Sequence, residues 1–263
     1  MKTTTYPSST RHYLEVLLAD IRTISTRWQM FAPFSCYLAL LNLHLLRPLL
    51  ERDRTENLLT CLLSPAELNI FHGFSYDKRQ LEWLGGRIAA KYALQAMSCS
   101  TTPAPHMYSI LPDRHGRPHI AQKPTGCPAV TVSIAHSSGY AAALACSKGS
   151  CGVDIQQKTP TLYRVQKRFA QKEELQAFDP SPLPPLTRLG LLWSAKEAVK
   201  KCFLPDHPSF LSAIRFTSAY SEQNNKIWIG QCSLSHTAHD HATVRMGEMD
   251  QHLIACTWGE NNA

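Results

Sequence analysis

The spacing of apolar residues along the chain predicts five helices. Residues 76–96 lack proline and carry apolar side chains three and four positions apart, as one helical face requires, at Leu81, Leu84, Ile88 and Tyr92. The Gly85–Gly86 pair lowers the helix propensity of this stretch and indicates close packing against a neighbouring element. A serine followed by proline at residues 64–65, with Glu67 in the first turn, is typical of a helix start. Further helices are expected over residues 13–24, 161–178 and 187–203.

Short apolar runs bounded by turn residues predict strands. Such runs cover residues 36–43 and 128–134. Two runs joined by a Ser-Lys-Gly-Ser turn predict a hairpin of residues 140–145 and 151–156. A strand meander is expected over residues 214–216, 226–232, 243–246 and 253–258. These elements indicate a mixed α/β fold rich in antiparallel strands.

Composition excludes several protein classes. With 263 residues, of which 44% are hydrophobic and 18% charged, the chain is neither disordered, collagen-like nor a coiled coil. A net charge of +7 favours an anionic partner, which can be nucleic acid, a phosphorylated cofactor or an acidic protein. The basic residues form no dense run of the kind found in nucleic-acid-binding tails.

The chain carries no obvious membrane or export signal. Prolines and charges interrupt its most apolar stretch, residues 31–50, so no transmembrane helix is predicted. The apolar run at residues 13–19 contains Glu15 and precedes no convincing cleavage site, so no signal peptide is expected. The nine cysteines, an odd number without a CxxC pair, are expected to be reduced and mostly buried. A cytoplasmic protein is therefore expected.

Two segments carry charged residues in unusual places. Asp154 lies in a predicted strand, on one face with Gly152 and Gln156, where it either binds a hard cation or proton or faces water from an edge strand. Trp193, Glu197 and Lys201 follow at four-residue intervals on a predicted helix. This stripe belongs either to a functional site or to an amphipathic boundary helix.

A third candidate is the turn at His136 and Ser137, whose side chains and backbone N–H groups can hold phosphate oxygens. With the acids and the lysine, this turn makes a site for Mg²⁺ and phosphate groups plausible. A divalent-metal phosphodiesterase or nuclease is an alternative, although it needs more carboxylates, and a basic nucleic-acid-binding module without catalysis is another. A zinc site is not expected, because the spacing matches no structural zinc pattern, at Cys232, His236, His239 and His241.

Five motifs in the same order carry a family resemblance. GVDIQ at 152–156 and WSAKEAVKK at 193–201 are similar to the two signature motifs of the 4'-phosphopantetheinyl transferases, (V/I)G(V/I)D and WxxKExxxK. SIAHS at 133–137, GRP at 116–118 and the helix at 79–91 also resemble that family. The resemblance covers residues 35–260 and is greatest to the surfactin-type monomeric branch.

The resemblance implies a 4'-phosphopantetheinyl transferase fold, which is a pseudo-twofold pair of similar subdomains with antiparallel-rich sheets and packed helices. The N-terminal half is then expected at residues 31–149 and the C-terminal half at 150–263, after an extension of unknown role at residues 1–30. The implied reaction moves the phosphopantetheine group of coenzyme A to a serine hydroxyl of an apo acyl or peptidyl carrier protein. It depends on Mg²⁺, or Mn²⁺, and releases adenosine 3',5'-bisphosphate.

The resemblance also assigns roles to single residues. Asp154 and Glu197 are implied metal ligands, with Glu197 or a water that it orients as the base for the serine. Lys201 is implied to neutralise the departing phosphate. Coenzyme A is implied to contact four further residues, with its phosphates at His136 and Ser137 and its adenine at Arg117 and Pro118.

The sequence departs from the family at two places. Gln156 stands where the surfactin-type branch usually has glutamate as a third metal ligand, which implies that the ion keeps a water there. Glu67 and Ile70 stand where lysines for the 3'-phosphate are expected. That role then falls to other basic residues, namely Arg79, Arg87 or Lys91.

Residues 157–172 are the expected docking surface for the carrier protein. Arg164, Lys167, Arg168 and Lys172 share one side of a predicted helix, opposite Leu162, Val165 and Phe169. Carrier proteins are generally acidic, so charge complementarity predicts docking near Arg164, Lys167, Arg168 and Phe169, although a solvated basic face is the simpler interpretation. A monomer without a nucleic-acid or membrane partner is expected.

Overall fold

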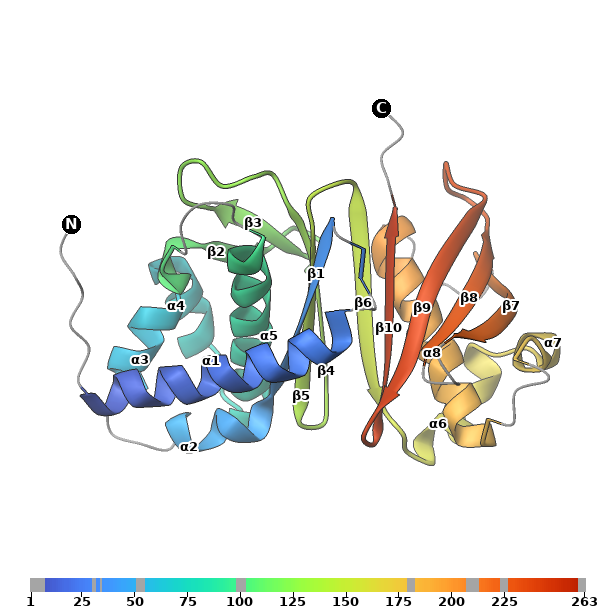
Figure 1. Cartoon of the computed structure of the whole chain (residues 1–263), viewed down its shortest axis with the longest axis horizontal. Coiled ribbons are helices and arrows are strands. Elements are labelled where there is room, and N and C mark those ends of the chain that lie inside the picture. The colour runs from blue at the N-terminus through green and yellow to red at the C-terminus, as the bar shows by residue number, and fades with distance from the viewer. Residues whose placement is uncertain are drawn as a thin grey trace.

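The computed structural model describes residues 8–29, 32–33, 35–50, 55–97, 103–178, 183–206, 213–222 and 227–259. We call the elements up to β5 the N-terminal half and those from β6 onward the C-terminal half. The two halves lie side by side along the long axis of the molecule (Figure 1).

The N-terminal half contains, in chain order, α1 (Ser8–Trp28), β1 (Cys36–Asn42), α2 (Arg47–Leu50), α3 (Thr55–Leu62), α4 (Pro65–His72), α5 (Asp77–Ala96), β2 (Ser109–Pro112), β3 (Pro118–Gln122), β4 (Thr131–Ser137) and β5 (Tyr140–Cys146). The C-terminal half contains β6 (Ser150–Gln157), α6 (Thr161–Val165), α7 (Lys172–Gln176), α8 (Pro185–Phe203), β7 (Ile214–Glu222), β8 (Ile227–Leu234), β9 (His241–Met249) and β10 (His252–Gly259).

The strand order repeats between the halves. A three-stranded antiparallel sheet has the order β1-β5-β4, and a five-stranded antiparallel sheet begins with the equivalent order β6-β10-β9 and continues with β8 and β7. In the N-terminal half, β2 and β3 form a separate pair. Between its first strand and its last four strands, each half has a run of helices that ends in a long one, α5 in the N-terminal half and α8 in the C-terminal half. The mixed α/β fold with two similar subdomains is confirmed.

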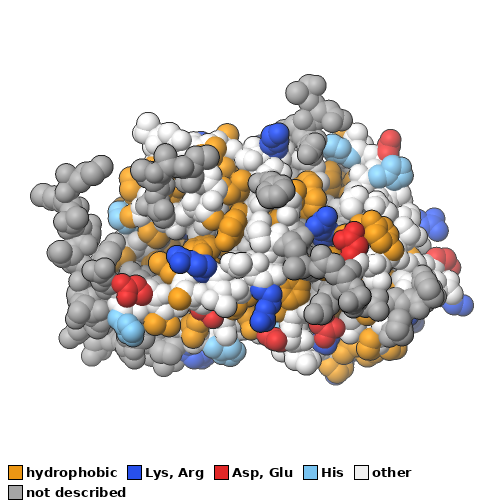
Figure 2. Space-filling view, in the orientation of Figure 1, with side chains coloured by type: hydrophobic (Ala, Val, Ile, Leu, Met, Phe, Trp, Pro, Cys, Tyr) orange, Lys and Arg blue, Asp and Glu red, His pale blue; other side chains and the backbone are white. Residues whose placement is uncertain are grey.

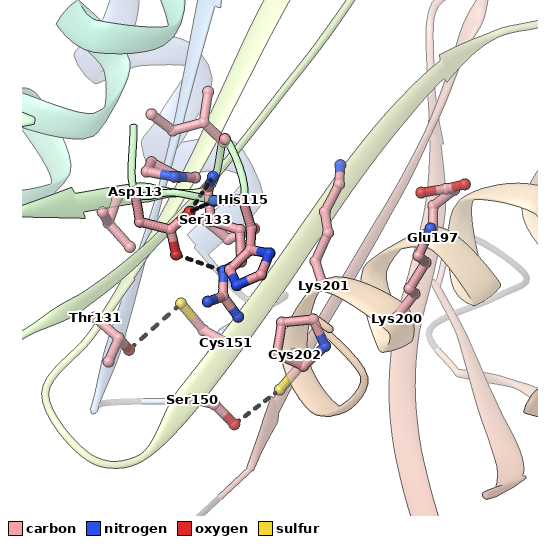
Figure 3. A pocket seen from close by; sticks show the side chains of 16 residues that line it. Asp113, His115, Thr131, Ser133, Ser150, Cys151, Glu197, Lys200, Lys201 and Cys202 are labelled. Atoms are coloured by element: carbon pink, nitrogen blue, oxygen red, sulfur yellow. Dashed lines mark hydrogen bonds and ion pairs between the residues drawn. The ribbon is translucent and has the colours of Figure 1, made fainter. Parts of the chain in front are cut away.

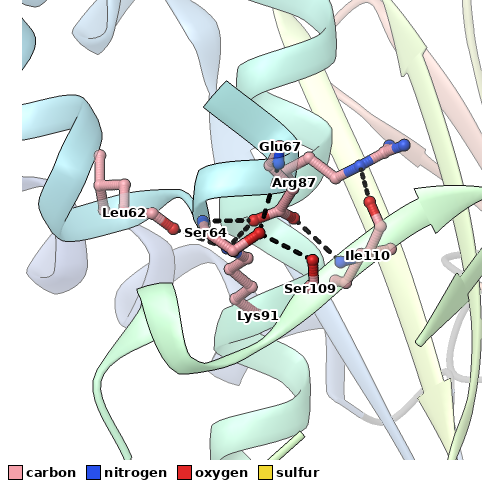
Figure 4. Close-up of polar contacts among 7 residues, drawn as sticks. All are labelled: Leu62, Ser64, Glu67, Arg87, Lys91, Ser109 and Ile110. Carbon is pink, nitrogen blue, oxygen red and sulfur yellow. Dashed lines mark hydrogen bonds and ion pairs between the residues drawn. The ribbon is translucent and has the colours of Figure 1, made fainter. Parts of the chain in front are cut away.

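A buried ion pair fixes α4 against α5 in the N-terminal half (Figure 4). Glu67 in the first turn of α4 accepts hydrogen bonds from the backbone N–H of Ser64 (2.8 Å) and of Ile110 (3.0 Å). Lys91 Nζ on α5 donates to the Leu62 carbonyl (2.7 Å) and lies 2.5 Å from Glu67 Oε2. Both charged side chains are almost fully buried. The pair therefore ties two helices and strand β2 together.

The C-terminal half contains the same arrangement at equivalent positions. Glu174 accepts hydrogen bonds from the backbone N–H of Gln171 (2.9 Å) and of Phe216 (2.9 Å). Lys196 Nζ donates to the Phe169 carbonyl (2.8 Å) and lies 2.6 Å from Glu174 Oε1. No repeat is visible in the amino-acid sequence, because the residues that pack around the two pairs differ while the hydrogen-bonding pattern is kept.

Strands β4 and β6 join the two halves through side chains. The Val153 N–H donates to Ser133 Oγ (3.1 Å), and the Gln157 N–H donates to Ser137 Oγ (2.9 Å). Both bonds join residues that are twenty positions apart, and a constant separation of this kind means that the two strands run in the same direction. The contacts are made by serine side chains and not by backbone-to-backbone hydrogen bonds. A hydrophobic cluster with members from β1, β4 and β5 and from β6, β8 and β10 packs across the same boundary.

Helix α1 covers the free edge of β1. Ser25 Oγ accepts a hydrogen bond from the Leu40 N–H (3.0 Å), and Gln29 Oε1 accepts one from the Leu38 N–H (3.2 Å). Gln29 Nε2 also donates to the Cys36 carbonyl (2.9 Å). Figure 1 shows α1 crossing the N-terminal half and ending beside β1. Side chains of α1 and of Gln29, which directly follows it, thus pair backbone groups that an edge strand would otherwise leave exposed.

Most of the expected elements form. The helices expected over residues 13–24, 76–96 and 187–203 are α1, α5 and α8, and the meander is β7 to β10. Ser64 caps α4 in a capping box with Glu67. A Cβ atom on Gly85 or Gly86 would lie within 2.1 or 2.7 Å of a neighbouring side chain, which confirms the expected close packing. The strand expected at 128–134 begins later and reaches Ser137.

The expected hairpin of residues 140–145 and 151–156 is wrong. Both strands form, as β5 and β6, but β5 pairs with β1 and β4, whereas β6 pairs with β10. Because β5 is central in its sheet, both of its edges are already used. The turn after β5 therefore leads the chain from one sheet into the other.

The helix expected over residues 161–178 is interrupted. The structure has α6, a 3-10 turn at Gln166–Arg168 and α7 in its place. Lys196 binds the Phe169 carbonyl, and Gln171 adopts extended backbone as the N-cap of α7. These contacts end one helix and begin the next.

The eight cysteines of the described residues are free thiols, and six are buried; Cys99 lies outside the described residues. Among the described residues, none of the helices has the length and hydropathy needed to cross a membrane.

Candidate active site

Helix α8 packs closely on strand β6 beside the site. A Cβ atom on Gly152 would lie 1.9 Å from the Ala198 carbonyl oxygen, so any larger residue would push the helix away. Gly152 and Asp154 share one face of β6, and that face is the one that α8 covers. The glycine therefore lets the helix bring its charged side chains up to Asp154.

Asp154 is paired with Lys201 under α8. Lys201 Nζ donates hydrogen bonds to Asp154 Oδ1 (2.9 Å) and to the Val153 carbonyl (2.9 Å). Asp154 is 8% exposed, and its second oxygen, Oδ2, accepts no hydrogen bond from the described residues. Burial raises the pKa of Asp154, while the Lys201 ammonium acts to lower it. The site thus holds a buried carboxylate with one oxygen available to a cation.

Glu197 is the second carboxylate of this site. It lies on α8, one turn before Lys201, and it is half-buried. Burial raises its pKa above the ordinary value of 4.5, and the neighbouring Asp154 carboxylate raises it further. A divalent cation between two neighbouring carboxylates would relieve this repulsion. Among the described residues, no group of three His, Cys, Asp or Glu side chains is arranged to hold a metal ion, so the remaining ligands would have to come from solvent and substrate oxygens.

A cleft of about 490 Å³ opens beside Glu197 and Lys201 (Figure 3). Both halves of the protein line it, with α8 and the start of β6 on one side and the loop before β3 and strand β4 on the other. Figure 3 shows Lys201 and Glu197 extending from α8, with Asp113 and His115 on the opposite wall. Its charged lining is mostly basic, with His115, Arg117, Lys200 and Lys201. Such a cleft suits a ligand that carries several phosphates.

Arg117 and Pro118 lie in the cleft wall. Asp113 accepts hydrogen bonds from Arg117 Nε (2.7 Å) and from the Arg117 N–H (2.9 Å). Arg117 NH1 also lies 3.1 Å from Asp206, which follows α8. Desolvation acts to raise the pKa of Asp113, but hydrogen bonds from Arg117 and His115 outweigh it and lower the pKa to about 2. Asp113 and Asp206 thus orient the guanidinium from both halves.

His136 and Ser137 lie at the end of β4, outside the lining of this cleft. His136 Nδ1 is 3.6 Å from Glu82 Oε2, and the imidazole is 34% exposed. Burial lowers the pKa of His136 below its ordinary value of 6.5, while the Glu82 carboxylate acts to raise it. Lys201 and Asp154 also act on this pKa, which places His136 near the carboxylate pair.

The structure does not bring Lys91 to the site. Its ammonium is buried in the ion pair with Glu67, so it cannot meet a ligand, and the expectation that Lys91 binds a cofactor is corrected. Arg87 is 7% exposed, donates from Nε to the Ile110 carbonyl (2.9 Å) and stacks on Trp83, and its burial lowers its pKa to about 10. It does not line the cleft.

Arg79 and Gln156 also lie outside the cleft lining. Arg79 is exposed on α5, with its guanidinium 5.4 Å from the Phe74 ring, and its charge acts on His136. Gln156 is half-buried and donates from Nε2 to the Gln157 carbonyl (2.9 Å). Its amide oxygen is the atom that could face a cation.

Sequence reasoning missed the residues that hold the site in place. Ser133 contacts Val153, Glu82 contacts His136, and Asp206 contacts Arg117. The two partners of each contact lie far apart in the sequence. Ser133 belongs to the SIAHS motif at 133–137, but the motif did not indicate its bond to the Val153 N–H. The other two lie in helix or loop positions where a charged residue is ordinary.

The expected docking surface is partly corrected. Arg164, Lys167 and Arg168 are exposed, as expected. Phe169 is fully buried and packs edge-on against Trp193, with 4.8 Å between the ring centroids, so it cannot contact a partner. On the face drawn in Figure 2, basic side chains of the described residues are separated by polar and apolar groups.

Two family models match the chain. The 4'-phosphopantetheinyl transferase N-terminal domain matches residues 73–146, and the 4'-phosphopantetheinyl transferase superfamily matches residues 150–257. The holo-[acyl-carrier-protein] synthase of Bacillus pumilus (strain SAFR-032) is 43% identical over 86 residues, which are 31% of this chain and 69% of that relative. The chain belongs to the 4'-phosphopantetheinyl transferase superfamily. The transferase class that the motifs predicted is thereby confirmed.

Other members of the 4'-phosphopantetheinyl transferases are also similar. The holo-[acyl-carrier-protein] synthase of Streptococcus agalactiae serotype III (strain NEM316) is 37% identical over 93 residues, which are 35% of this chain and 77% of that relative. A holo-(acyl-carrier-protein) synthase from Bacillus anthracis str. Ames, solved in complex with CoA (3',5'-ADP), aligns with a TM-score of 0.36 and 21% identity, over 42% of this chain and 92% of that chain.

Proposed function

We propose that the chain transfers the phosphopantetheine group of coenzyme A to a serine of an apo acyl or peptidyl carrier protein, with Mg²⁺, and releases adenosine 3',5'-bisphosphate. The observation that carries this proposal is the Asp154, Glu197 and Lys201 group beside a basic cleft between two similar halves. The repeated halves, expected at 31–149 and 150–263, favour the two-halved, surfactin-type branch. We further propose a cytoplasmic monomer.

The charged groups suit attack of a hydroxyl on a diphosphate. The serine oxygen forms a bond to the β-phosphorus, and the bond from this phosphorus to the bridging oxygen breaks, so that adenosine 3',5'-bisphosphate leaves. Glu197, or a water that it orients, accepts the serine proton. Lys201 places a positive charge where negative charge develops on the leaving phosphate.

The residues fit a divalent cation. Asp154 Oδ2 is buried without a hydrogen bond from the described residues, and Glu197 is the second carboxylate near it. These two side chains would hold Mg²⁺, with Gln156 as an additional contact through water. The bound ion would supply positive charge to the diphosphate oxygens.

The cleft suits the remainder of coenzyme A. Arg117 and Pro118 would contact its adenine end in the cleft, and His136 and Ser137, which lie outside the cleft lining at the end of β4, would contact its phosphates. Arg79 and Arg87 remain candidates for the 3'-phosphate, and Lys91 is removed from this set because Glu67 uses its charge. The ligand would lie between the halves and meet side chains from both.

Intact-mass spectrometry of apo carrier proteins tests the proposal. Purified protein, coenzyme A and Mg²⁺ should add about 340 Da, one phosphopantetheine group, to at least one carrier. Asp154→Asn and Glu197→Gln should abolish the gain while retaining the fold. Glu248→Gln, an exposed carboxylate in an ion pair with Lys158, is the matched control and should keep it. No gain with any carrier, from a protein that also fails to bind coenzyme A, would refute the proposal.

A further inference from the structure

The turn after His136 and Ser137 adopts an uncommon backbone. Ser137 pairs with Tyr140 as the last rung between β4 and β5, so Ser138 and Gly139 alone form the turn. Their φ angles are 23° and 98°, both positive. Two-residue hairpin turns of this kind prefer glycine, asparagine or aspartate, because a side chain disfavours positive φ. Ser138 therefore needs support from its surroundings.

His252, the first residue of β10 in the other half, supplies such support. Its Nε2 lies 3.1 Å from the Ser138 carbonyl oxygen. A carbonyl oxygen only accepts hydrogen bonds, so Nε2 carries the proton and donates it. The histidine is 4% exposed, and the Tyr140 ring packs edge-on against it at 4.9 Å between centroids. Tyr140 in turn donates to Asp250 Oδ2 (3.2 Å), which holds the ring in place.

A second bond from the same rung holds the preceding residue. Gln157 pairs with His252 between β6 and β10, and the Gln157 N–H donates to Ser137 Oγ (2.9 Å). One rung of the C-terminal sheet thus binds two successive residues of the N-terminal half. Because Ser137 Oγ accepts this bond, its own proton is left to donate to a ligand. The turn is therefore fixed to β6, the strand that carries Asp154.

We infer that His252 is a positioning residue, which holds the Ser138 turn across the boundary so that His136 and Ser137 meet the phosphates of coenzyme A in register with Asp154. The inference rests on the proposed function for the identity of the ligand. His252 itself does not line the cleft. Its effect on the ligand is indirect, through the backbone of the turn.

Three variants test this role. His252→Leu removes the donor, and His252→Gln keeps an N–H donor at nearly the same distance from the backbone. Thr257→Val is the matched control. Thr257 is fully buried toward the other end of β10 from His252, and its hydroxyl donates to the Thr243 carbonyl (2.7 Å) and not to the Ser138 turn. Calorimetry with coenzyme A alone gives its Kd, and transfer assays give KM and kcat separately.

His252→Leu should raise the Kd and the KM for coenzyme A about five- to tenfold, the effect of one lost hydrogen bond on a binding turn, with a smaller change in kcat. His252→Gln should restore most of the affinity. Thr257→Val should lower thermal stability to a similar extent and leave the Kd unchanged. Equal Kd values in His252→Leu and Thr257→Val would overturn the inference.

The strained turn offers an independent test. Ser138→Gly relieves the positive φ of residue 138, so in the His252→Leu background it should recover part of the affinity, whereas in the wild type it should change little. Amide hydrogen exchange at Gly139 should accelerate in His252→Leu and slow again in the double variant. Unchanged exchange would overturn the inference even if the wild type bound no coenzyme A, a result that would refute the proposed function separately.

Discussion

Lys201 and Asp154 form an ion pair across the contact between α8 and β6, with 2.9 Å between Nζ and Oδ1. The ammonium contacts only one of the two carboxylate oxygens of Asp154. Oδ1 is neutralised by the ammonium, while Oδ2 is buried and accepts no hydrogen bond from the described residues. Lys201 thus opposes the rise in the pKa of Asp154 that burial causes, and it leaves Oδ2 open to a cation.

Removing this ammonium should shift the pH dependence of transfer. In Lys201→Met the pKa of Asp154 rises further, because the charge that lowers it is gone. The acidic limb of the kcat/KM profile should then move to higher pH, and kcat/KM at neutral pH should fall about 100-fold. Lys201→Arg keeps the charge and should leave the limb near its wild-type position. An unmoved limb in Lys201→Met would show that Asp154 does not titrate in the reaction.

Glu197 should destabilise the metal-free protein at alkaline pH. Burial raises its pKa in the folded state above 4.5, so the stability it contributes is complete below that pH and is lost as pH rises through the folded-state pKa. Without divalent cations at pH 8, Glu197→Gln should therefore melt about 2–4 °C above the wild type. At pH 4, where the carboxyl is protonated, the two Tm values should converge. A variant that melts below the wild type at pH 8 would contradict this account.

Mg²⁺ provides the complementary measurement. Added MgCl₂ should raise the Tm of the wild type more than that of Glu197→Gln, because a ligand that binds only the folded state stabilises it more when it binds more tightly. An equal rise in both proteins would show that the ion binds elsewhere.

The elements that local sequence specifies were predicted well, and the pairing between distant elements was not. Ser64 and Glu67 form the capping box that their spacing indicates, because both partners lie in one helical turn. The hairpin of β5 and β6 failed because apolar alternation and a short turn do not say which edge a strand will pair with. That choice depends on β1 and β10, which lie about a hundred residues from the strands they join.

The lysines show the same limit within the site. Lys91 and Lys201 both lie on helical faces that also carry aromatic residues. The spacing along these faces does not predict which carboxylate each ammonium will contact. Lys91 pairs with Glu67, which is 24 residues away, and Lys201 pairs with Asp154, which is 47 residues away. The second contact matched a family motif, whereas the first had no signal in the sequence. Resemblance therefore located the carboxylate pair but misplaced a structural cation.

The buried pair of Lys91 and Glu67 should matter for stability alone. Lys91→Met leaves an uncompensated carboxylate in the core and should cost about 3–5 kcal/mol of unfolding free energy in denaturant titrations. Adding Glu67→Gln should recover part of this loss, because the buried charge is then removed. Lys78→Met removes an exposed ammonium that lies 3.8 Å from Glu82 and should change stability by less than about 1 kcal/mol. A KM for coenzyme A that rises severalfold in Lys91→Met would return this residue to the ligand site.

Helix α1 should protect the edge of β1. Ser25→Ala and Gln29→Ala leave the N–H groups of Leu40 and Leu38 without their side-chain partners, which should cost about 1–3 kcal/mol for each variant. The double variant should also self-associate in sedimentation experiments, because an unpaired edge strand offers a template for another chain. Thr23→Ala is the control, since its hydroxyl bonds only the Ala19 carbonyl within α1. A monodisperse double variant with wild-type stability would show that α1 serves another purpose.

The exposed basic side chains after β6 should guide an acidic carrier protein to the site. Arg164 and Lys167 are exposed on α6 and the 3-10 turn that follows it, next to the core that Phe169 fills. Reversing both charges, in Arg164→Glu with Lys167→Glu, should raise the KM for carrier protein about tenfold at low salt and leave the KM for coenzyme A unchanged.

Salt separates this electrostatic effect from a change in shape. Attraction between exposed charges is screened as ionic strength rises, so the difference between wild type and the double variant should shrink at high salt. Lys123→Glu changes an exposed lysine in the N-terminal half and should alter neither KM. If the double variant differs equally from the wild type at all salt concentrations, the loss comes from disturbed structure. If the double variant and the wild type have the same KM for carrier protein at low salt, the carrier docks on another surface. An acidic protein that bound close to Arg164 and Lys167 would bind more weakly after both charges were reversed.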